Sequence, residues 1–276
     1  MKLSLITATH HRVDKFATVA LPSVLAQTDR SFEWVVVNDG RDEKTRYLIS
    51  EVKSKTDITI TYLEMNHPEL GFGLCHARNL GLEAASGDFV AYLDDDNALA
   101  PGFVESVRKF FQHNSTIRCS MVRQRRRRDV TSKGTLVRQG ATFYSPGVES
   151  STEDLIQQNQ LFDSNGFVHT RSFAPLWNPS YKVFADYEYF LQCLSRWGRK
   201  SFKLNPLVLV DYVQSKEGVI GQSNYGEWAK ELQQICCSSN EYSVLTQADM
   251  AALGQMVEQW NRKHQQGLSL PGFSAK

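Results

Sequence analysis

The chain has 276 residues, and its 31 lysine and arginine side chains nearly balance 30 aspartate and glutamate side chains, giving a formal net charge of +1. This balance excludes a protein that binds nucleic acid or an anionic bilayer through its overall charge. A hydrophobic content of 41% with 22% charged residues excludes a disordered or fibrous chain.

The first hundred residues alternate between predicted strands and predicted helices. Short apolar runs separate stretches in which apolar residues recur at helical spacing. Pro22 lies inside the first helical stretch and predicts a kink or a second helix start there. The alternation predicts an α/β layered sheet with mostly parallel strands. The predicted strands are 3–8, 32–37, 58–63 and 89–93, and the predicted helices are 14–25, 44–53 and 73–85.

The remainder of the chain has a less regular pattern. Residues 164–178 have the composition of a loop, and Lys133-Gly134 that of a turn between two strands. We find no internal repeat or low-complexity linker in the sequence, so we expect one domain with a helical tail. The predicted strands here are 117–122, 136–144 and 207–213, and the predicted helices are 186–197, 225–236 and 247–264.

Polar residues gather directly after three of the predicted parallel strands, in the segments 7–12, 38–41 and 94–97. The carboxyl ends of parallel strands meet at one edge of a sheet, and ligands bind there. The last segment contains three consecutive aspartates, 94–96, whose carboxylates repel one another and need a compensating cation. A hard divalent cation that also binds substrate phosphates suits them. A solvated acidic turn before the next helix, which Pro101 would help to start, is the alternative.

Several segments occur together in a recognisable order. ITATHHR, SVLAQT, FEWVVVNDG and GLCHARNLGLEAASGDFVAYLDDDN follow one another in the first hundred residues, and FADYEYFLQCL comes later. In this order and spacing the chain resembles family 2 glycosyltransferases of the GT-A fold. The resemblance implies a Rossmann-like mixed sheet flanked by helices, with a C-terminal helical extension. It implies a transferase domain over 1–215, with a nucleotide-binding half (1–100) and an acceptor and catalytic half (101–215), and a mobile loop and helical tail over 216–276 packed on it.

The resemblance implies a nucleotide-sugar site at the carboxyl edge of the sheet. From the residues alone, the threonine hydroxyls of segment 7–12 also fit a role in satisfying backbone groups, and the aspartate of segment 38–41 fits a turn. The family often has Asp-Asp-Gly where this chain has Asn38-Asp39-Gly40. The residues implied to line the pocket of the base and the ribose are Thr7, Ala8, Thr9, Arg12 and Asp39.

The same resemblance assigns the acidic segment to the diphosphate. Asp94 would face the ribose, and Asp96 would hold Mn²⁺ or Mg²⁺ with Asp94 as a second ligand. Asp95 would belong to the same nucleotide-sugar site. Arg78 would lie near the nucleotide and the acidic segment, although an ion pair on a helix surface also explains this arginine. Asn97 stands where the family frequently has a fourth acidic residue.

Sugar transfer needs a base within hydrogen-bond reach of the acceptor hydroxyl. The resemblance implies that Asp186 is this base, although Ala185 stands where the family usually has a glutamate. A simple helix N-cap is the alternative for Asp186. Glu188 falls on a polar helix face with Gln192, away from the apolar stripe, and is the weaker candidate. The resemblance also implies inversion at the anomeric carbon without an enzyme nucleophile.

A basic run from Arg123 to Arg128 is the largest local imbalance of charge. From residue 123 to residue 138 the formal charge is seven basic minus one acidic, or +6. We consider nucleic acid, anionic lipid headgroups or an acidic acceptor as its partner, and a solvated hairpin whose arginines pair with carboxylates elsewhere as the alternative. The residues considered for peripheral membrane contact are Arg125, Arg126, Arg127 and Arg128.

Four further residues are candidates for acceptor contact or for a lid. Residues 215–224 have the composition of a mobile loop that would exclude water on closing, although a surface loop fits as well. The four candidates are His169, Arg171, Gln222 and Ser223.

Five scattered cysteines do not form a disulfide framework, and no apolar run approaches the roughly 20 residues of a membrane span. The first residues hold too short an apolar stretch for a signal peptide. We therefore expect a cytoplasmic protein, peripheral at most to the inner face of the membrane. The expected function is metal-dependent transfer from a nucleoside-diphosphate sugar, with UDP favoured, to a glycan, lipid-linked or other hydroxyl acceptor, without nucleic acid. The alternative is a glycan- or nucleotide-binding module without turnover.

Overall fold

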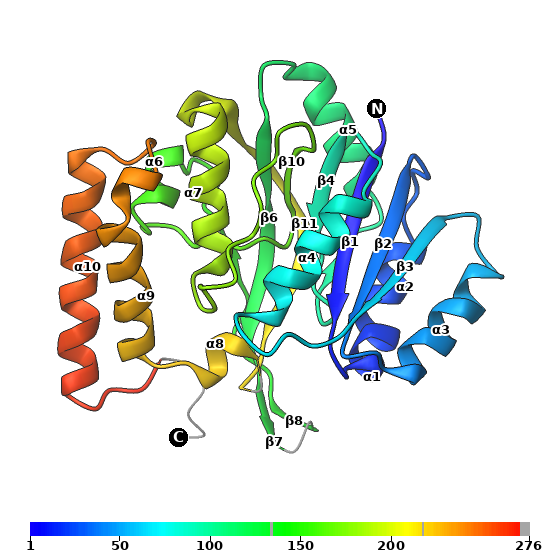
Figure 1. Cartoon of the computed structure of the whole chain (residues 1–276), viewed down its shortest axis with the longest axis horizontal. Coiled ribbons are helices and arrows are strands. Elements are labelled where there is room, and N and C mark those ends of the chain that lie inside the picture. The colour runs from blue at the N-terminus through cyan, green and yellow to red at the C-terminus, as the bar shows by residue number, and fades with distance from the viewer. Residues whose placement is uncertain (133–134, 217, 271–276) are drawn as a thin grey trace.

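The computed structural model describes residues 1–132, 135–216 and 218–270, so the turn predicted at Lys133-Gly134 lies outside the described residues. Nine strands form one sheet in the order β3-β2-β1-β4-β10-β6-β11-β5, with β9 paired to β6 (Figure 1). Two short strands, β7 and β8, pair separately. The strands are β1 Leu3–Thr9, β2 Phe32–Asp39, β3 Thr59–Met65, β4 Phe89–Tyr92, β5 Ala98–Leu99, β6 Cys119–Arg128, β7 Val130–Ser132, β8 Thr135–Arg138, β9 Phe143–Ser145, β10 Phe167–Thr170 and β11 Phe202–Gln214.

The parallel arrangement predicted for the first hundred residues is confirmed. Strand β1 runs parallel to β2 and β4, and β2 runs parallel to β3. All eight residues of β2 are buried, as expected for a parallel strand covered on both faces. Strands β10 and β5 pair only in antiparallel fashion, so the sheet as a whole is mixed.

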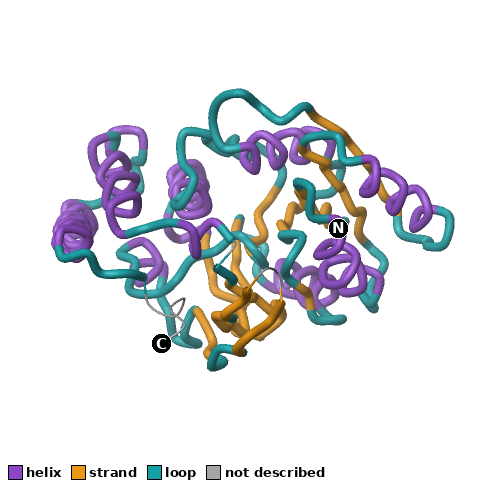
Figure 2. The backbone as a smooth tube through the Cα atoms, turned by 90° about the horizontal axis from the view of Figure 1, so that it is seen from below, coloured by secondary structure: helices purple, strands orange, loops and turns teal. Residues whose placement is uncertain are grey.

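Helices cover both faces of the sheet, and Figure 2 shows them on either side of the strands. One apolar core joins the sheet to α4, α7, α9 and α10, and the other joins it to α2, α3 and α5. The helices are α1 Val13–Lys15, a π-helical turn at Phe16–Ala20, α2 Leu21–Leu25, α3 Glu43–Lys53, α4 Gly73–Ala84, α5 Phe103–His113, α6 Thr152–Ile156, α7 Ala185–Trp197, α8 Val219–Gln222, α9 Tyr225–Cys237 and α10 Gln247–Gln265.

The helical stretch around Pro22 is continuous but changes its hydrogen-bond pattern. A π-helical turn ends at Ala20, and α2 begins at Leu21 with the proline in its first turn. The Leu21 N–H still donates to the Phe16 backbone oxygen, so the helix runs on without a break. The change of hydrogen-bond pattern falls beside Pro22, which has no N–H to donate, where the sequence predicted a kink or a second helix start.

Three predictions for the middle of the chain differ from the structure. Residues 164–178 were expected to form a loop, but they contain β10, which pairs with β4 on one side and β6 on the other. Four residues are too few to show a period. The strand predicted at 117–122 extends to Arg128, because β11 pairs with β6 along the whole arginine run. The strand predicted at 136–144 is divided into β8 and β9.

The C-terminal helices pack on the sheet through α7. Helices α9 and α10 lie side by side next to α7 (Figure 1), and their apolar residues join the same core as those of α7. Glu188 of α7 is 1% exposed, and its carboxylate accepts a hydrogen bond of 2.8 Å from the hydroxyl of Tyr242. The polar face predicted around Glu188 is thus buried by the C-terminal extension. Within the described ranges, no helix is both long and apolar enough to cross a membrane.

Candidate functional site

The polar segments after β1 and β4 meet at the carboxyl edge of the sheet. The hydroxyl of Thr9 donates to Asp95 at 2.8 Å, and a terminal nitrogen of Arg12 lies 3.1 Å from the same carboxylate. Arg12 also pairs with Asp96. One guanidinium therefore faces two of the three consecutive carboxylates, and the acidic segment retains excess negative charge.

The three aspartates have different surroundings. Asp95 is 3% exposed, and burial raises the pKa of its carboxyl to about 7 against the opposing effect of Arg12. Burial also raises the pKa of Asp96, whose side chain keeps 20% exposure. Both oxygens of Asp94 are occupied, one by Arg78 at 2.8 Å and the other by the amide of Asn165 at 2.8 Å. The oxygens of Asp96 also have partners, one in Arg12 and the other in the amide of Asn97 at 3.3 Å, so the hydrogen bonds alone do not decide which carboxylate of the segment would bind a metal.

Arg78 joins the acidic segment to α7. It is 2% exposed, and its two terminal nitrogens donate to Asp94 at 2.8 Å and to Asp186 at 2.6 Å. Its guanidinium carbon lies 4.3 Å from the centre of a Trp177 ring. These contacts exclude the alternative of an ion pair on a helix surface. Arg78 instead fixes the distance between two carboxylates that are 92 positions apart in the chain.

Asp186 lies in the first turn of α7 but does not cap it. The N-cap position is Phe184, which has no polar side chain. One carboxylate oxygen of Asp186 accepts from Arg78, and the other accepts from the backbone N–H of Ser164 at 3.3 Å. The side chain keeps 26% exposure. The cap alternative is excluded, and a partly exposed carboxylate faces Asp94 across Arg78.

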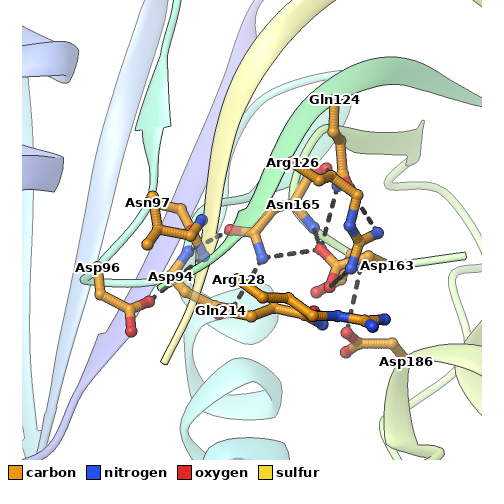
Figure 3. Close-up of polar contacts among 12 residues, drawn as sticks. Asp94, Asp96, Asn97, Gln124, Arg126, Arg128, Asp163, Asn165, Asp186 and Gln214 are labelled. Atoms are coloured by element: carbon orange, nitrogen blue, oxygen red, sulfur yellow. Dashed lines mark hydrogen bonds and ion pairs between the residues drawn. The ribbon is translucent and has the colours of Figure 1, made fainter. Parts of the chain in front are cut away.

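A buried amide and a buried acid complete the site, and no pattern in the sequence predicted either residue. The amide of Asn165 forms two hydrogen bonds with Asp94, because its oxygen also accepts from the Asp94 backbone N–H at 2.7 Å (Figure 3). Asp163 in turn accepts from Asn165 at 2.9 Å and from Gln124 at 3.2 Å. Burial, followed by the negative charge of Asp186, raises the pKa of Asp163 to about 6. Asp163 and Asn165 directly precede β10, the strand that the sequence pattern did not predict.

Asp39, at the end of β2, carries two histidine neighbours. Nδ1 of His67 lies 2.9 Å from Oδ2 of Asp39, and Nδ1 of His10 donates to the Asp39 backbone oxygen at 2.9 Å. The ligand atoms of these three residues lie within 4.8 Å of one another. Oδ1 of Asp39 is buried and has no hydrogen-bond partner among the described residues. Asp39 is thus held in place with one acceptor atom still available, which is more than a turn residue requires.

Several predicted site residues lie elsewhere. The Thr7 hydroxyl accepts from Trp34 at 3.0 Å inside the core, and Ala8 is a partly buried residue of the opposite face. His169 is fully buried between the hydroxyls of Tyr92 and Tyr189, and burial lowers its pKa to about 4.

Arg171 follows β10 at the edge where β4 begins, away from the acidic segment, and donates to the Gly87 backbone oxygen. Gln222 ends the short helix α8, which lies at the edge of the sheet where β1 ends (Figure 1). The Ser223 hydroxyl accepts from the Trp228 indole at 2.7 Å. The structure therefore brings neither His169 nor Arg171 to the site.

The basic run is largely paired within the fold. Arg125 forms two hydrogen bonds of 2.6 Å with Asp211, and Arg127 pairs with Asp129 at 2.9 Å. Arg126 is 3% exposed and cannot reach a bilayer, so its predicted membrane contact is wrong. The predicted contact through Arg125, Arg127 and Arg128 stays a prediction. The alternative of arginines paired with carboxylates of the fold describes Arg125 and Arg127.

This mixed sheet, with an acidic turn after β4 facing a carboxylate on α7, defines a GT-A type fold. TarS 1–349 from S. aureus, solved with UDP-GlcNAc, aligns with 97% of this chain and 74% of its own at a TM-score of 0.65 and 15% identity. The mannosyltransferase PcManGT from Pyrobaculum calidifontis, solved with GDP-Man and Mn²⁺, aligns with 98% of this chain and 77% of its own at a TM-score of 0.63 and 14% identity.

The model of glycosyl transferase family 2 matches residues 4–175, and the chain belongs to this family. An uncharacterized glycosyltransferase from Rickettsia bellii is 34% identical over 116 residues, which are 42% of this chain and 16% of that protein. The chain therefore spans only a small part of the length of this curated relative, and similarity to it is confined to part of the fold.

Proposed function

We propose that the protein transfers a sugar from a nucleoside-diphosphate sugar to an acceptor hydroxyl. The observation that carries this proposal is the arrangement Asp94–Arg78–Asp186, in which one buried arginine holds a donor-side carboxylate and a partly exposed carboxylate on α7 at fixed positions. The solved structures with nucleotide sugars, TarS with UDP-GlcNAc and PcManGT with GDP-Man, support the same assignment.

A divalent cation, Mn²⁺ or Mg²⁺, fits the acidic segment. Asp95 and Asp96 share one arginine and both have a raised pKa from burial, so added positive charge would stabilise their ionised forms. Asp96 would hold the ion, and Asp94, which Arg78 and Asn165 hold in place, would face the ribose, as the family resemblance implies. When bound, such an ion neutralises charge that develops on the leaving diphosphate.

The remaining steps belong to the side chains of this chain. Asp186 keeps one oxygen on Arg78, and its other oxygen, held only by a long contact of 3.3 Å, accepts the proton of the acceptor hydroxyl. The deprotonated oxygen attacks the anomeric carbon from the side opposite the diphosphate. The bond between that carbon and the diphosphate oxygen breaks, the nucleoside diphosphate leaves with the electron pair, and the configuration at the carbon is inverted. No covalent intermediate with the enzyme is needed.

Asp39 supports a preference for particular bases. Its free Oδ1 is a buried acceptor, and it suits an imide-type N–H such as that of uracil or guanine. Adenine and cytosine carry no such N–H. We therefore favour UDP over other nucleotides, with GDP as the second candidate.

The five cysteines lie in the described part of the chain and form no disulfide, which supports a cytoplasmic location.

The test is a thermal-shift panel of UDP, GDP, ADP and CDP and their sugars, with and without Mn²⁺. The proposal requires metal-dependent stabilisation by UDP or GDP that is lost in Asp96→Asn. Indifference to every nucleotide would favour the binding module without turnover. Slow hydrolysis of a sugar donor that survives in Asp96→Asn would contradict the metal role of Asp96.

A further inference from the structure

Three of the seven histidines gather beside Asp39, at the ends of three neighbouring strands. His10 and His11 directly follow β1. Asp39 is the last residue of β2, and His67 comes two residues after β3. The ring centre of His10 lies 4.6 Å from that of His67 and 4.5 Å from that of His11. Since β3, β2 and β1 are consecutive in the sheet, strand order brings these side chains together.

The spacing of His10, Asp39 and His67 suits a tetrahedral metal ion. Nδ1 of His67 lies 2.9 Å and Nδ1 of His10 lies 3.6 Å from Oδ2 of Asp39. Zinc binds imidazole nitrogen and carboxylate oxygen at about 2.0–2.2 Å, and tetrahedral geometry then separates two ligand atoms by about 3.3 Å. The two distances lie on either side of this value. Binding would turn Nδ1 of His10 from the Asp39 backbone oxygen, 2.9 Å away, toward the ion.

The carboxylate of Asp39 is buried beside imidazoles and not beside a permanent cation. Its side chain keeps 5% exposure, and in the described part of the chain its ion pairs are with His10 and His67. A neutral imidazole donates a hydrogen bond but leaves the negative charge uncompensated, whereas a metal ion supplies the positive charge. Oδ1 is buried as well and has no hydrogen-bond partner among the same residues. Hydrogen bonds within the cluster therefore leave Asp39 with capacity for a cation.

The two imidazoles are accessible, and the backbone beneath them is closely packed. The side chains of His10 and His67 keep 47% and 53% exposure, so an ion reaches them without any opening of the fold. A Cβ added at Gly73, the first residue of α4, would lie only 2.5 Å from Oδ2 of Asp39. The start of α4 thus approaches the cluster as closely as glycine allows. Three protein ligands leave the fourth position of the ion to water, which is typical of an exchangeable site.

The ligand atoms distinguish this cluster from the acidic segment after β4. Mn²⁺ and Mg²⁺ prefer oxygen ligands, whereas imidazole nitrogen suits Zn²⁺, Ni²⁺ and Cu²⁺. The three consecutive aspartates 94–96 offer carboxylate oxygen alone. The histidine cluster offers one ligand atom from each of two imidazoles and one carboxylate, all within 4.8 Å of one another. The two positions therefore select different classes of metal ion, and zinc would bind to the histidine cluster in excess Mg²⁺.

We propose that His10, Asp39 and His67 form a Zn²⁺ site that overlaps the pocket of the base and excludes the nucleotide. The zinc site rests on the geometry alone, whereas the exclusion rests on the proposed function, in which Asp39 contacts the base. An ion on Oδ2 draws negative charge away from Oδ1, the atom offered to the base. It also turns His10 and brings a water ligand into the segment between Thr9 and Arg12. Zinc therefore acts as a reversible inhibitor of donor binding.

The experiment measures binding of Zn²⁺ to the full chain by titration calorimetry in excess Mg²⁺. His10→Ala and His67→Ala each remove one ligand, and they lie on different segments. His113→Ala removes an exposed histidine at the end of α5 and is the matched control, and Asp96→Asn tests the acidic segment. We expect one zinc ion per chain, bound at least about tenfold more weakly in each of the first two variants and equally well in the other two.

A second titration measures the affinity for UDP in excess Mg²⁺, with and without saturating Zn²⁺. We expect zinc to lower the affinity of the unaltered chain for UDP by at least about tenfold, because the base loses its acceptor on Asp39. The affinity of His67→Ala should not respond to zinc. This variant also controls for binding of zinc by UDP itself, which would affect both proteins equally.

The outcomes are distinct. No zinc binding in excess Mg²⁺, or equal binding by the unaltered chain, His10→Ala and His67→Ala, overturns the site. Zinc binding that is lost in Asp96→Asn places the ion on the acidic segment and overturns the site as well. Zinc binding through both histidines with an unchanged affinity for UDP overturns the exclusion of the nucleotide. Absence of UDP binding to the unaltered chain contradicts the proposed function, whereas zinc binding that still depends on both histidines supports the metal site.

Discussion

The two sides of the site that the proposed function assigns to the donor and to the acceptor are built in different ways. The donor side uses loops after the parallel strands β1, β2 and β4, whose carboxyl ends meet because the strands are neighbours in the sheet. The acceptor side joins the end of β6, the segment before β10 and the first turn of α7. Strand order places the donor residues, whereas individual hydrogen bonds place the acceptor residues. We therefore expect single substitutions on the acceptor side to have the more specific effects.

The largest effect should follow loss of the residue that joins the two sides. Arg78→Met leaves Asp94 and Asp186 without their shared arginine inside the protein, and breaking such a buried pair costs about 3–5 kcal/mol. We expect a lower melting temperature and loss of detectable transfer. Arg78→Lys keeps the charge but not the two-point geometry, so it should recover stability more than activity. Full activity in Arg78→Lys would show that the charge alone suffices.

Asp186→Asn should lower the rate of sugar transfer without changing the affinity for the nucleotide. The amide retains the size of the side chain but cannot accept a proton from the acceptor, so the transfer rate should fall by about 10²–10⁴-fold. Nucleotide binding, measured by calorimetry with Mn²⁺, should stay unchanged because the donor residues are untouched. Asp94→Asn is the matched comparison, since Asp94 contacts the same arginine from the donor side and its substitution should weaken nucleotide binding. Unchanged transfer in Asp186→Asn would exclude this residue as the base.

The sequence predicted the donor side much better than the acceptor side. Asp94, Asp96, Asp39 and Arg12 follow parallel strands with clear apolar patterns, so strand order alone brings them together. Asn165 and Asp163 precede a strand of only four residues, and no period in the sequence marks it. The strand predicted at 117–122 ends too early for a related reason. The arginine run continues that strand because it pairs with β11, and its own composition does not predict an extended conformation.

The C-terminal extension bears on this comparison, because α9 contacts the segment that leads into α7. The carboxylate of Glu231, on α9, accepts from the backbone N–H groups of Lys182 at 3.1 Å and Phe184 at 2.9 Å. These groups directly precede α7 and Asp186, so Glu231 acts as a positioning residue for the base. Glu231→Ala should lower kcat by about tenfold, the loss of roughly 1–2 kcal/mol of hydrogen bonding, and leave the KM for the donor unchanged.

Glu231→Gln is the conservative variant, because its amide oxygen still accepts hydrogen bonds. It should restore most of the rate. The exposed Glu227 on the same helix supplies a control for the change in charge, since its carboxylate accepts from the backbone N–H of Asn224 at the start of the helix. A parallel rise in the KM for the donor would indicate general loosening of the fold instead of misplacement of Asp186.

The smallest effect on activity should come from the donor half itself, at the edge of the sheet away from the site. Glu33 is 4% exposed and accepts hydrogen bonds from Lys2, Ser4 and Ser86. These partners outweigh burial and lower its pKa to about 2. Since the unfolded chain binds a proton at Glu33 near pH 4.5, the stabilisation is fully present above that pH and is lost as the pH falls toward 2.

Glu33→Gln should therefore reduce the free energy of unfolding by about 2 kcal/mol at pH 7, and the difference from the unaltered chain should shrink at pH 3. Urea unfolding at pH 7 and pH 3 measures this difference in the free energy of unfolding. The titration of the other acidic residues contributes equally to both proteins and therefore drops out of the difference. Transfer activity of the folded variant at pH 7 should be unchanged, since the parallel strands still deliver the donor residues to the opposite edge. A loss of nucleotide binding in this variant would mean that strand order alone does not place the donor side.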